Sequence, residues 1–353
     1  MNITEAKNAI DTVINKARVH LYKPIQVAEI LFRERTTGGI VLSELETYRT
    51  KSRKWRDAVC INFLGRTSTS SARYQDDIFN ENAVPPVALV ALGEENNAKG
   101  GIVEKYIYDK FAERYTQMSS ALEYCSNATK ESFNLEEFFN LFWEEAGLRR
   151  SIDKIYEIVV YALFSILIDE IEVKINISYN AEKVDVLKEF EDFATKVIGL
   201  DSSVDSYTQL ARINRVGVTN AADRGLDMWA NFGTAVQIKH LSLSEKLAED
   251  IISSVSSDRI VIVCKDSEES VIVSLLSQIG WRAKIQSIIT EHELIAWYEK
   301  AMRGKYADVI GEKLLKILGE EIINEFPSTE NTEFGEFYEE RGYHKISDDF
   351  WKV

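Results

Sequence analysis

The sequence predicts an α/β protein with a mainly helical N-terminal half, residues 1–165, followed by an α/β half, residues 166–353, in which helices flank a mixed central sheet. Two patterns predict this division. In the first half apolar residues recur at helical spacing, and in the second half strand-like alternation appears between helical segments. The 353 residues, 45% of them hydrophobic and 28% charged, suffice to bury a core in each half.

Helical periodicity in the first half begins at residues 2–35, where Pro24 marks the start of a second helix because proline has no backbone donor to lose there. A turn follows at residues 36–40. Pro85-Pro86 and Gly100-Gly101 then interrupt the pattern. Further helices are predicted at residues 55–64, 103–120, 135–146 and 152–168.

Strands and helices alternate in the second half. The apolar run Ile260-Val-Ile-Val-Cys264 is typical of a strand covered on both faces. The predicted elements are a strand at 172–178, a helix at 183–198, strands at 211–218, 226–230 and 234–241, a helix at 244–255, a strand at 259–264, a helix at 268–279, a strand at 283–289 and a helix at 293–303.

The composition excludes several classes of protein. No apolar run reaches the roughly 20 residues that cross a bilayer, and the N-terminus lacks the apolar core of a signal peptide, so we expect a cytoplasmic protein. Cys60, Cys125 and Cys264 have neither the spacing of a zinc site nor the density of a disulfide scaffold. The absence of a glycine-rich phosphate loop and of a nucleophile elbow disfavours a small-molecule enzyme.

Charge is unevenly distributed along the chain. The 57 acids and 42 Lys and Arg give a net charge of −15, and residues 320–340 form an acidic segment without Lys or Arg. Residues 49–73, in contrast, form a basic island in which Asp57 is the single acid. Its cations are Arg49, Lys51, Arg53, Lys54, Arg56, Arg66 and Arg73. The island is either a solvated helix face or a nucleic-acid contact.

One cluster in the second half is suited to catalysis. Alternate residues of a strand share a face, so Gln237 and Lys239 point the same way. A turn at residues 231–234 folds the preceding strand back and can set Asp227 beside that pair. A carboxylate, an amide oxygen and an ammonium group then converge, which suits Mg²⁺-dependent cleavage of a phosphodiester.

A rival triplet, Glu172-Val173-Lys174, also lies on a predicted strand. It lacks a strand-borne acid upstream, because Asp153 falls on a predicted helix. The order of a strand with Asp227, a strand with Gln237 and Lys239, a helix, a strand and a helix favours the first cluster.

The pattern Asp227…Gln237-x-Lys239, in that order of elements, looks like the PD-(D/E)xK nuclease core. The segments that contain it, Arg224-Gly-Leu-Asp-Met-Trp-Ala-Asn-Phe-Gly233 and Val236-Gln-Ile-Lys-His-Leu241, resemble the HaeII family of type II restriction endonucleases. Four N-terminal segments are also similar to that family, so the resemblance spans most of the chain: His20-Leu-Tyr-Lys-Pro-Ile-Gln26, Ser52-Arg-Lys-Trp-Arg-Asp57, Arg66-Thr-Ser-Thr-Ser-Ser71 and Glu81-Asn-Ala-Val-Pro-Pro86.

The resemblance implies a PD-(D/E)xK-type core that makes Mg²⁺-dependent double-strand breaks in unmethylated DNA at a GC-rich palindrome of the form RGCGCY. It also implies a homodimer and a protective DNA methyltransferase. Asp227 corresponds to the first metal-binding acid and Lys239 to the lysine of the motif, whereas Gln237 stands where the superfamily usually has Asp or Glu. The implied metal ligands are Asp227, Gln237 and the backbone carbonyl of Ile238, with Glu189 or Glu191 as a further acid.

The resemblance also favours DNA contacts by the basic island, since arginine is the commonest partner of guanine in the major groove. The expected contacts are Arg53, Arg56, Arg66 and Arg73. Asp223 and Arg224 either orient Asp227, contact a phosphate or belong to a capped turn.

Packing is the favoured role for the other side chains near the cluster, namely His240 in the core and Trp229 and Phe232 in the hairpin.

Two alternative functions are compatible with part of these sequence features. A structure-specific repair or junction nuclease would have the same core but would need no large recognition region. A catalytically inactive DNA-binding protein would keep the island but would not need Asp227 and Lys239 together.

Overall fold

The computed structural model describes the chain except residues 69, 146, 217–225, 256, 258, 268–270, 272–273, 275–276, 278–283 and 327–330 and the side chains of 245 and 331–333. The described residues form two compact units. The first lies within Met1–Ile158 and Leu315–Val353, and the second within Val159–Val216 and Arg224–Leu314. Among the described residues no helix has both the length and the apolarity needed to cross a membrane.

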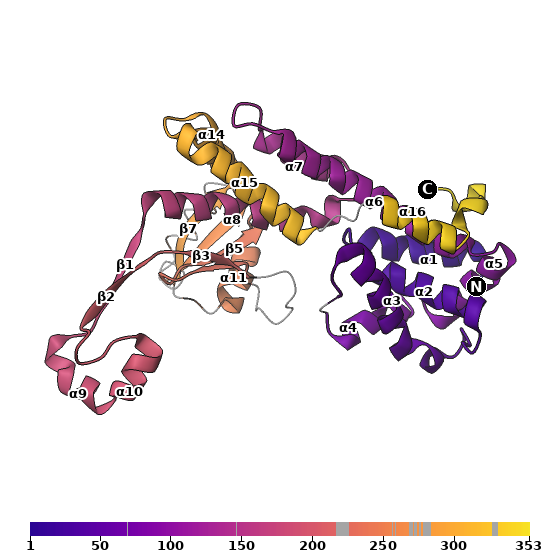
Figure 1. Cartoon of the computed structure of the whole chain (residues 1–353), viewed down its shortest axis with the longest axis horizontal. Helices are drawn as coiled ribbons and strands as arrows, with labels where there is room; N and C mark the ends of the chain where they lie inside the picture. The colour runs from indigo at the N-terminus through magenta and orange to yellow at the C-terminus, as the bar shows by residue number, and fades with distance from the viewer. Residues whose placement is uncertain are drawn as a thin grey trace. The chain divides into compact units, whose positions relative to one another are not determined.

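The first unit is helical, as the sequence predicts (Figure 1). Helix α3 begins six residues before the helix predicted at 55–64, and α6 ends seven residues after the helix predicted at 103–120. Helix α5, which begins directly after Pro85, was not predicted. Pro24 is the third residue of α2. The helices are α1 Ile3–Lys16, α2 Tyr22–Thr37, α3 Arg49–Leu64, α4 Ala72–Asp76, α5 Pro86–Ala98, α6 Ile102–Asn127, α7 Leu135–Glu144 and α16 Asn331–Glu340. The unit boundaries fall inside α8 Ile152–Ile171 and α15 Ala307–Glu325.

The C-terminal residues complete the core of the first unit. The sequence placed them in the second half as an acidic tail, but Tyr343 and Trp351 are buried among residues of α1 to α6. On α16, Phe334 and Phe337 pack against the same core and against Phe63. Glu336, Glu339 and Glu340 of this helix are exposed, so the described part of the segment is amphipathic and its acidic charge did not indicate its packing.

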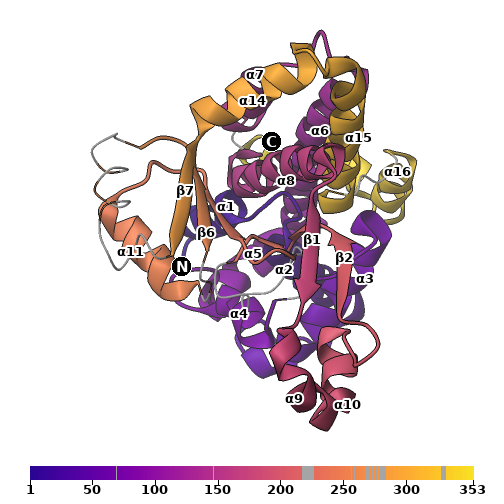
Figure 2. The same cartoon turned by 90° about the vertical axis from the view of Figure 1, so that its left-hand side faces the viewer.

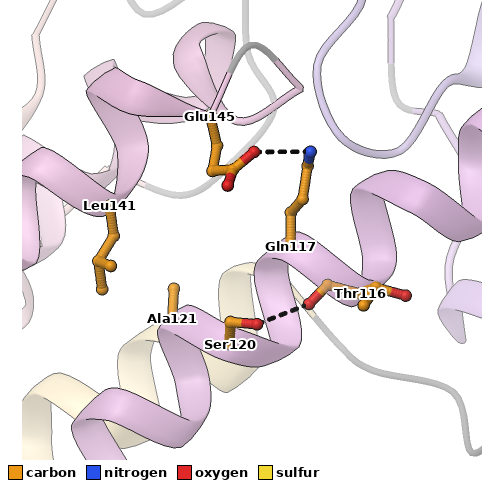
Figure 3. A pocket seen from close by; sticks show the side chains of 6 residues that line it. All are labelled: Thr116, Gln117, Ser120, Ala121, Leu141 and Glu145. Atoms are coloured by element: carbon orange, nitrogen blue, oxygen red, sulfur yellow. Dashed lines mark hydrogen bonds between the residues drawn. The ribbon is translucent and has the colours of Figure 1, made fainter.

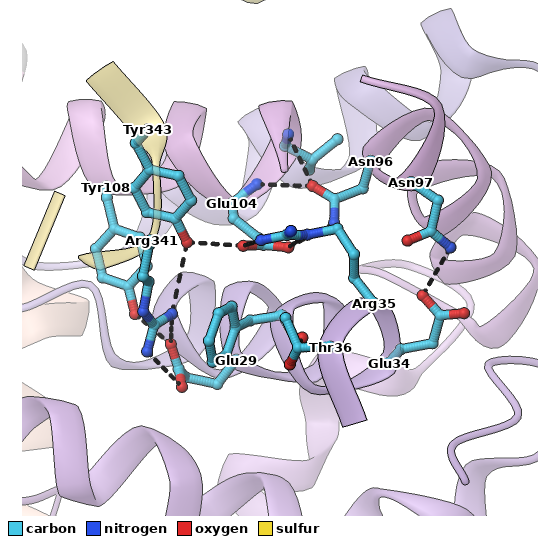
Figure 4. A network of polar contacts seen from close by, with 12 residues as sticks. Glu29, Glu34, Arg35, Thr36, Asn96, Asn97, Glu104, Tyr108, Arg341 and Tyr343 are labelled. Atoms are coloured by element: carbon cyan, nitrogen blue, oxygen red, sulfur yellow. Dashed lines mark hydrogen bonds and ion pairs between the residues drawn. The ribbon is translucent and has the colours of Figure 1, made fainter. Parts of the chain in front are cut away.

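A network of buried polar groups holds this C-terminal segment (Figure 4). Arg341 donates from both terminal nitrogens to the carboxylate of Glu29, at 2.6 and 3.2 Å, and Tyr108 donates to the same carboxylate at 2.6 Å. Tyr343 donates to Glu104, which also accepts two bonds from Arg35. Glu29 and Glu104 are 1% and 0% exposed, so loss of a cationic partner would cost about 3 to 5 kcal/mol.

The second unit contains a five-stranded mixed sheet in the order β3-β4-β5-β6-β7. The strands β3 Ile213–Arg215, β4 Met228–Ala230 and β5 Ala235–Lys239 pair antiparallel, and β6 Ile260–Cys264 and β7 Ile285–Thr290 continue the sheet parallel to β5. Helix α11 Glu245–Ser254 links β5 to β6, and α14 Glu291–Arg303 follows β7. These predicted elements are confirmed within a few residues, but the helix predicted at 268–279 falls largely outside the described residues.

A second, two-stranded ladder pairs β1 Lys174–Ser178 with β2 Ser206–Leu210. Beyond its end lie α9 Val184–Glu189, α10 Glu191–Phe193 and the π-helical turn η5 Ala194–Ile198, where the sequence predicted one helix (Figures 1 and 2). We call Lys174–Leu210 the arm. Asn231 ties its base to the sheet, because the Asn231 side chain accepts from the Arg212 N–H at 2.8 Å and donates to the Leu210 carbonyl at 3.1 Å.

Arg66, which we expected to contact DNA, instead anchors the end of α15. Its guanidinium donates to the backbone carbonyls of Asn324 and Glu325 and lies 2.6 Å from Nε2 of His20. The His20 ring is 6% exposed and stacks against the rings of Tyr22 and Phe326. Arg66 thus supplies a cation to a helix C-terminus, where backbone carbonyls lack partners.

His20 must be neutral to accept a hydrogen bond from Arg66 at Nε2. Burial, and then the Arg66 charge, lower the pKa of His20 from 6.5 to about 3. Below pH 6.5 the unfolded chain therefore binds a proton that the folded chain does not, and stability falls as the pH falls. Between pH 7 and 5 this group should remove about 2 kcal/mol from the free energy of unfolding.

Urea unfolding at pH 7 and pH 5 tests this prediction. His20→Gln should lose stability less steeply with falling pH than the wild type, whereas the exposed His344→Gln should retain the wild-type dependence. Equal pH dependence in the wild type and His20→Gln would contradict it.

Candidate active site

The β4–β5 hairpin brings the predicted cluster together. Met228 pairs with Val236 and Trp229 with Ala235. The turn between the strands is closed by a bond from the Ala230 N–H to the Thr234 carbonyl at 2.8 Å. Gly233 in this turn has φ +94°, a conformation that glycine adopts without strain. The register continues beyond β4, so that Asp227 lies opposite Gln237.

The carboxylate of Asp227 is fixed by two hydrogen bonds from β5. Its Oδ2 accepts from Nε2 of Gln237 at 2.6 Å and from the backbone N–H of Ile238 at 2.7 Å. Because the N–H and C=O of a strand residue point to the same side, the Ile238 carbonyl is directed toward the same edge. Three oxygen-bearing groups that the sequence singled out are therefore neighbours.

Gln237 is 2% exposed, and its Oε1 has no hydrogen-bond partner among the described residues. A buried amide oxygen without a partner costs free energy, so this atom is suited to a ligand. Lys239 is half-buried two residues further along β5, on the same face as Gln237.

The donor set fits a hard divalent cation. A carboxylate, an amide oxygen and a backbone carbonyl are ligands of the kind that Mg²⁺ takes, and Mg²⁺ normally keeps several waters besides. The described residues contain no group of three His, Cys, Asp or Glu that could hold a metal. The described part of the cluster holds one carboxylate, that of Asp227.

Glu189 and Glu191, expected as further metal-binding acids, are not brought to this cluster. Both lie in the arm beyond the end of the β1–β2 ladder, whose five paired residues span roughly 16 Å. Glu191 instead accepts from the N–H and hydroxyl of Ser202, at 3.0 and 2.6 Å, which lowers its pKa. The expectation rested on the helix predicted at 183–198, which precedes the cluster in the sequence, but this segment lies beyond the two-stranded ladder.

Trp229 differs from its expected role as a packed residue. Its side chain is 46% exposed on β4, between the buried Met228 and Ala230, and strand alternation places it on the face of Asp227. Phe232 and His240 are half-buried. Alternation along β4 was the signal that could have predicted an exposed tryptophan beside the cluster.

The basic island divides into internal and exposed cations. Arg56 is 1% exposed and donates to Gln26 and Asp57, so burial excludes the expected DNA contact. Its phase on α3 matches the buried Ser52, Val59, Cys60 and Phe63, a signal that the sequence already contained.

Among the other cations of the island, Arg53 forms an ion pair with Asp76 at 3.6 Å. The exposed cations of the island are Lys51, Lys54 and Arg73. Arg224 lies outside the described residues.

The first unit also has a pocket of about 260 Å³ between α6 and α7 (Figure 3). Gln117 donates to Glu145 across it at 2.8 Å, and Ala121 and Leu141 line the rest. The one acid that lines this pocket, Glu145, already accepts a hydrogen bond from Gln117. The Asp227 cluster, in the second unit, is therefore the better candidate for the active site.

Comparison with known proteins identifies the family to which the chain is similar. The family model described as HaeII restriction endonuclease matches residues 6–343. The type II restriction enzyme HaeII of Haemophilus aegyptius is 61% identical over 347 residues, which cover 98% of this chain and 99% of that protein. The type II restriction enzyme NgoBI of Neisseria gonorrhoeae is 55% identical over 340 residues, 96% of each chain. No solved structure matches.

Proposed function

We propose, because this chain belongs to the HaeII restriction endonuclease family and is a type II site-specific deoxyribonuclease, that it makes Mg²⁺-dependent double-strand breaks in unmethylated DNA at a GC-rich palindrome of the form RGCGCY. The observation that carries the chemistry is the bonding of Asp227 to Gln237 and Ile238 on the face of Lys239. A palindrome is matched by a twofold protein, so we also propose a homodimer. A cognate methyltransferase in the same cytoplasm would act on the same DNA without binding the enzyme.

The second unit is assigned to the PD-(D/E)xK type. Three antiparallel strands, a helix and a parallel strand follow one another as in that core. Asp227 precedes the second antiparallel strand of this sheet, Gln237 lies in the middle of the third, and Lys239 ends it. This arrangement supports the assignment through the order of elements and the positions of the three side chains.

The roles of these side chains follow from their geometry. Asp227, held in place by the Ile238 N–H, would bind Mg²⁺ together with the Gln237 amide oxygen and the Ile238 carbonyl. A bound Mg²⁺ would polarise the scissile phosphate and stabilise the charge that develops in the transition state. Lys239 would place its ammonium group near the phosphoryl oxygens, where it stabilises negative charge in a half-buried site.

Asp227→Ala and Lys239→Ala should each slow cleavage of plasmid DNA by roughly 100-fold or more, because each removes a charge that the transition state needs. DNA affinity should change little, since most affinity comes from contacts elsewhere. Cleavage in Mg²⁺ and gel shift in EDTA measure the two effects separately. Lys246→Ala, an exposed lysine at the start of α11, is the control and should cut normally. Wild-type rates in both active-site variants would overturn the assignment.

Gln237→Glu should bind Mg²⁺ or Mn²⁺ more tightly than the wild type, because it sets a second carboxylate 2.6 Å from Asp227. Without metal the two like charges repel, so the metal should also raise the melting temperature more than in the wild type. Calorimetric titration and thermal unfolding provide two measurements that do not depend on cleavage. Gln286→Glu on the exposed side of β7 controls for added charge. An unchanged metal affinity would remove Gln237 from the ligands.

For DNA binding we retain Arg53 and Arg73 and add Lys51 and Lys54, because Arg56 and Arg66 are held by internal partners. Arg73 is exposed, so its guanidinium is available for a bidentate contact to guanine. The exposed lysines are suited to phosphates, which carry no sequence information. Arg224 is retained as a phosphate contact from the sequence alone.

Arg73→Ala should weaken binding to an RGCGCY duplex by about 1 to 3 kcal/mol and leave binding to a scrambled duplex nearly unchanged. Lys51→Ala should weaken both and reduce the salt slope by about one unit. Competition binding across a salt series distinguishes these effects. Equal losses on the two duplexes for Arg73→Ala would assign that residue to phosphate binding.

A further inference from the structure

The arm carries an apolar surface that no described part of its own unit covers. Val186, Phe190, Phe193 and Val197 are 57%, 61%, 56% and 68% exposed. Their spacings of four, three and four residues place them along one side of the helical segment from α9 to η5. We call these four residues the apolar stripe. An adjacent side of the segment packs inward, where Ala194 is 4% exposed.

The stripe belongs to an ordered surface. The helical path continues through the breaks, since Phe190 N–H donates to the Val186 carbonyl and Ala194 N–H to the Phe190 carbonyl. Ser202 bonds to Glu191, and the hydroxyl of Tyr207 on β2 donates to the Ile198 carbonyl at 3.0 Å. These bonds hold the segment against the ladder, so its apolar side is exposed in a fixed position.

The charge of this region argues against DNA as its partner. Residues 181–205 contain seven acids and three lysines. A phosphate backbone would be repelled, whereas a protein surface with apolar groups at its centre would not. The arm therefore fits a protein partner.

The order of residues along the stripe is symmetric, Val-Phe-Phe-Val, with spacings of four, three and four residues. A twofold axis between Phe190 and Phe193 would set Val186 against Val197 of a second copy, and Phe190 against Phe193. Such self-complementarity is what a twofold interface requires of one patch.

The exposed apolar area is also large enough for a specific dimer interface. Together with Ile198 and Val204, both 42% exposed, the stripe offers roughly 500 Å² of apolar surface per chain. Two copies would bury roughly 1,000 Å² of it, which reaches the lower limit of specific interfaces before the polar rim is counted.

We propose that two copies of this chain pair through the apolar stripe of the arm, in antiparallel orientation about an axis between Phe190 and Phe193. The proposal rests on the homodimer of the proposed function and identifies its surface. It needs neither metal nor DNA, so it can be tested without cleavage.

Sedimentation equilibrium of the full chain without DNA should give twice the chain mass of 40.3 kDa. Phe190→Glu/Phe193→Glu should raise the dimer dissociation constant about 100-fold or more, because it places four like charges at the centre of the interface. Both positions are exposed, so the variant should keep the wild-type circular dichroism and melting temperature at equal monomer concentration. Val309→Glu, at a residue 47% exposed on α15, is the matched control and should remain dimeric.

Oxidative cross-linking tests the orientation. A mixture of Val186→Cys and Val197→Cys chains should form a disulfide-linked heterodimer in higher yield than either chain alone, and the native cysteines are all buried. A monomeric wild type, or a glutamate variant that remains a dimer, would overturn the inference. Plasmid cleavage by the wild type tests the proposed function separately, because a chain that cuts RGCGCY but pairs elsewhere would overturn only the arm interface.

Discussion

The register of β5 is the constraint on which the site depends. This strand is central, paired antiparallel with β4 and parallel with β6, and a slip of one residue on either side would turn Gln237 and Lys239 to the opposite face. The bond from the Ile238 N–H to Asp227 helps to prevent such a slip, because it ties a side chain beyond the end of β4 to one backbone position of β5. The turn at Gly233 fixes the other end of the pair.

Charge in the first unit is used mainly to hold the fold together. Arg56, Arg66 and Arg341 each direct the guanidinium at partners inside the protein: an amide and a carboxylate, backbone carbonyls, and a buried glutamate. Arginine can satisfy several acceptors at once without losing its charge, so it is suited to both interior bonding and DNA binding. The number of arginines in a sequence segment can therefore exceed the number of positive charges on its surface. In this unit the exposed lysines are a better guide to the positively charged surface.

The sequence predicted the hairpin, the parallel strands and the Asp227 cluster because alternation and a glycine turn are local signals. It did not predict β2, Ser206–Leu210, which is short and largely polar and is a strand only because β1 pairs with it. The return of Phe334, Tyr343 and Trp351 to the N-terminal core depends on contacts between residues more than two hundred positions apart, which no local pattern reports. The burial of Arg56, in contrast, was predictable from its phase on α3, which it shares with the buried Ser52, Val59 and Phe63.

The placement of the arm has a consequence for catalysis. Asn231, which holds the arm, follows β4, whereas Asp227 precedes it, so the two side chains mark opposite ends of a strand and are separated by roughly 13 Å. A partner held by the arm is therefore tied to the end of the hairpin that carries no reactive group. The end with Asp227 would remain for the phosphate and metal of the proposed function, and Trp229 is exposed on the same face between the two ends.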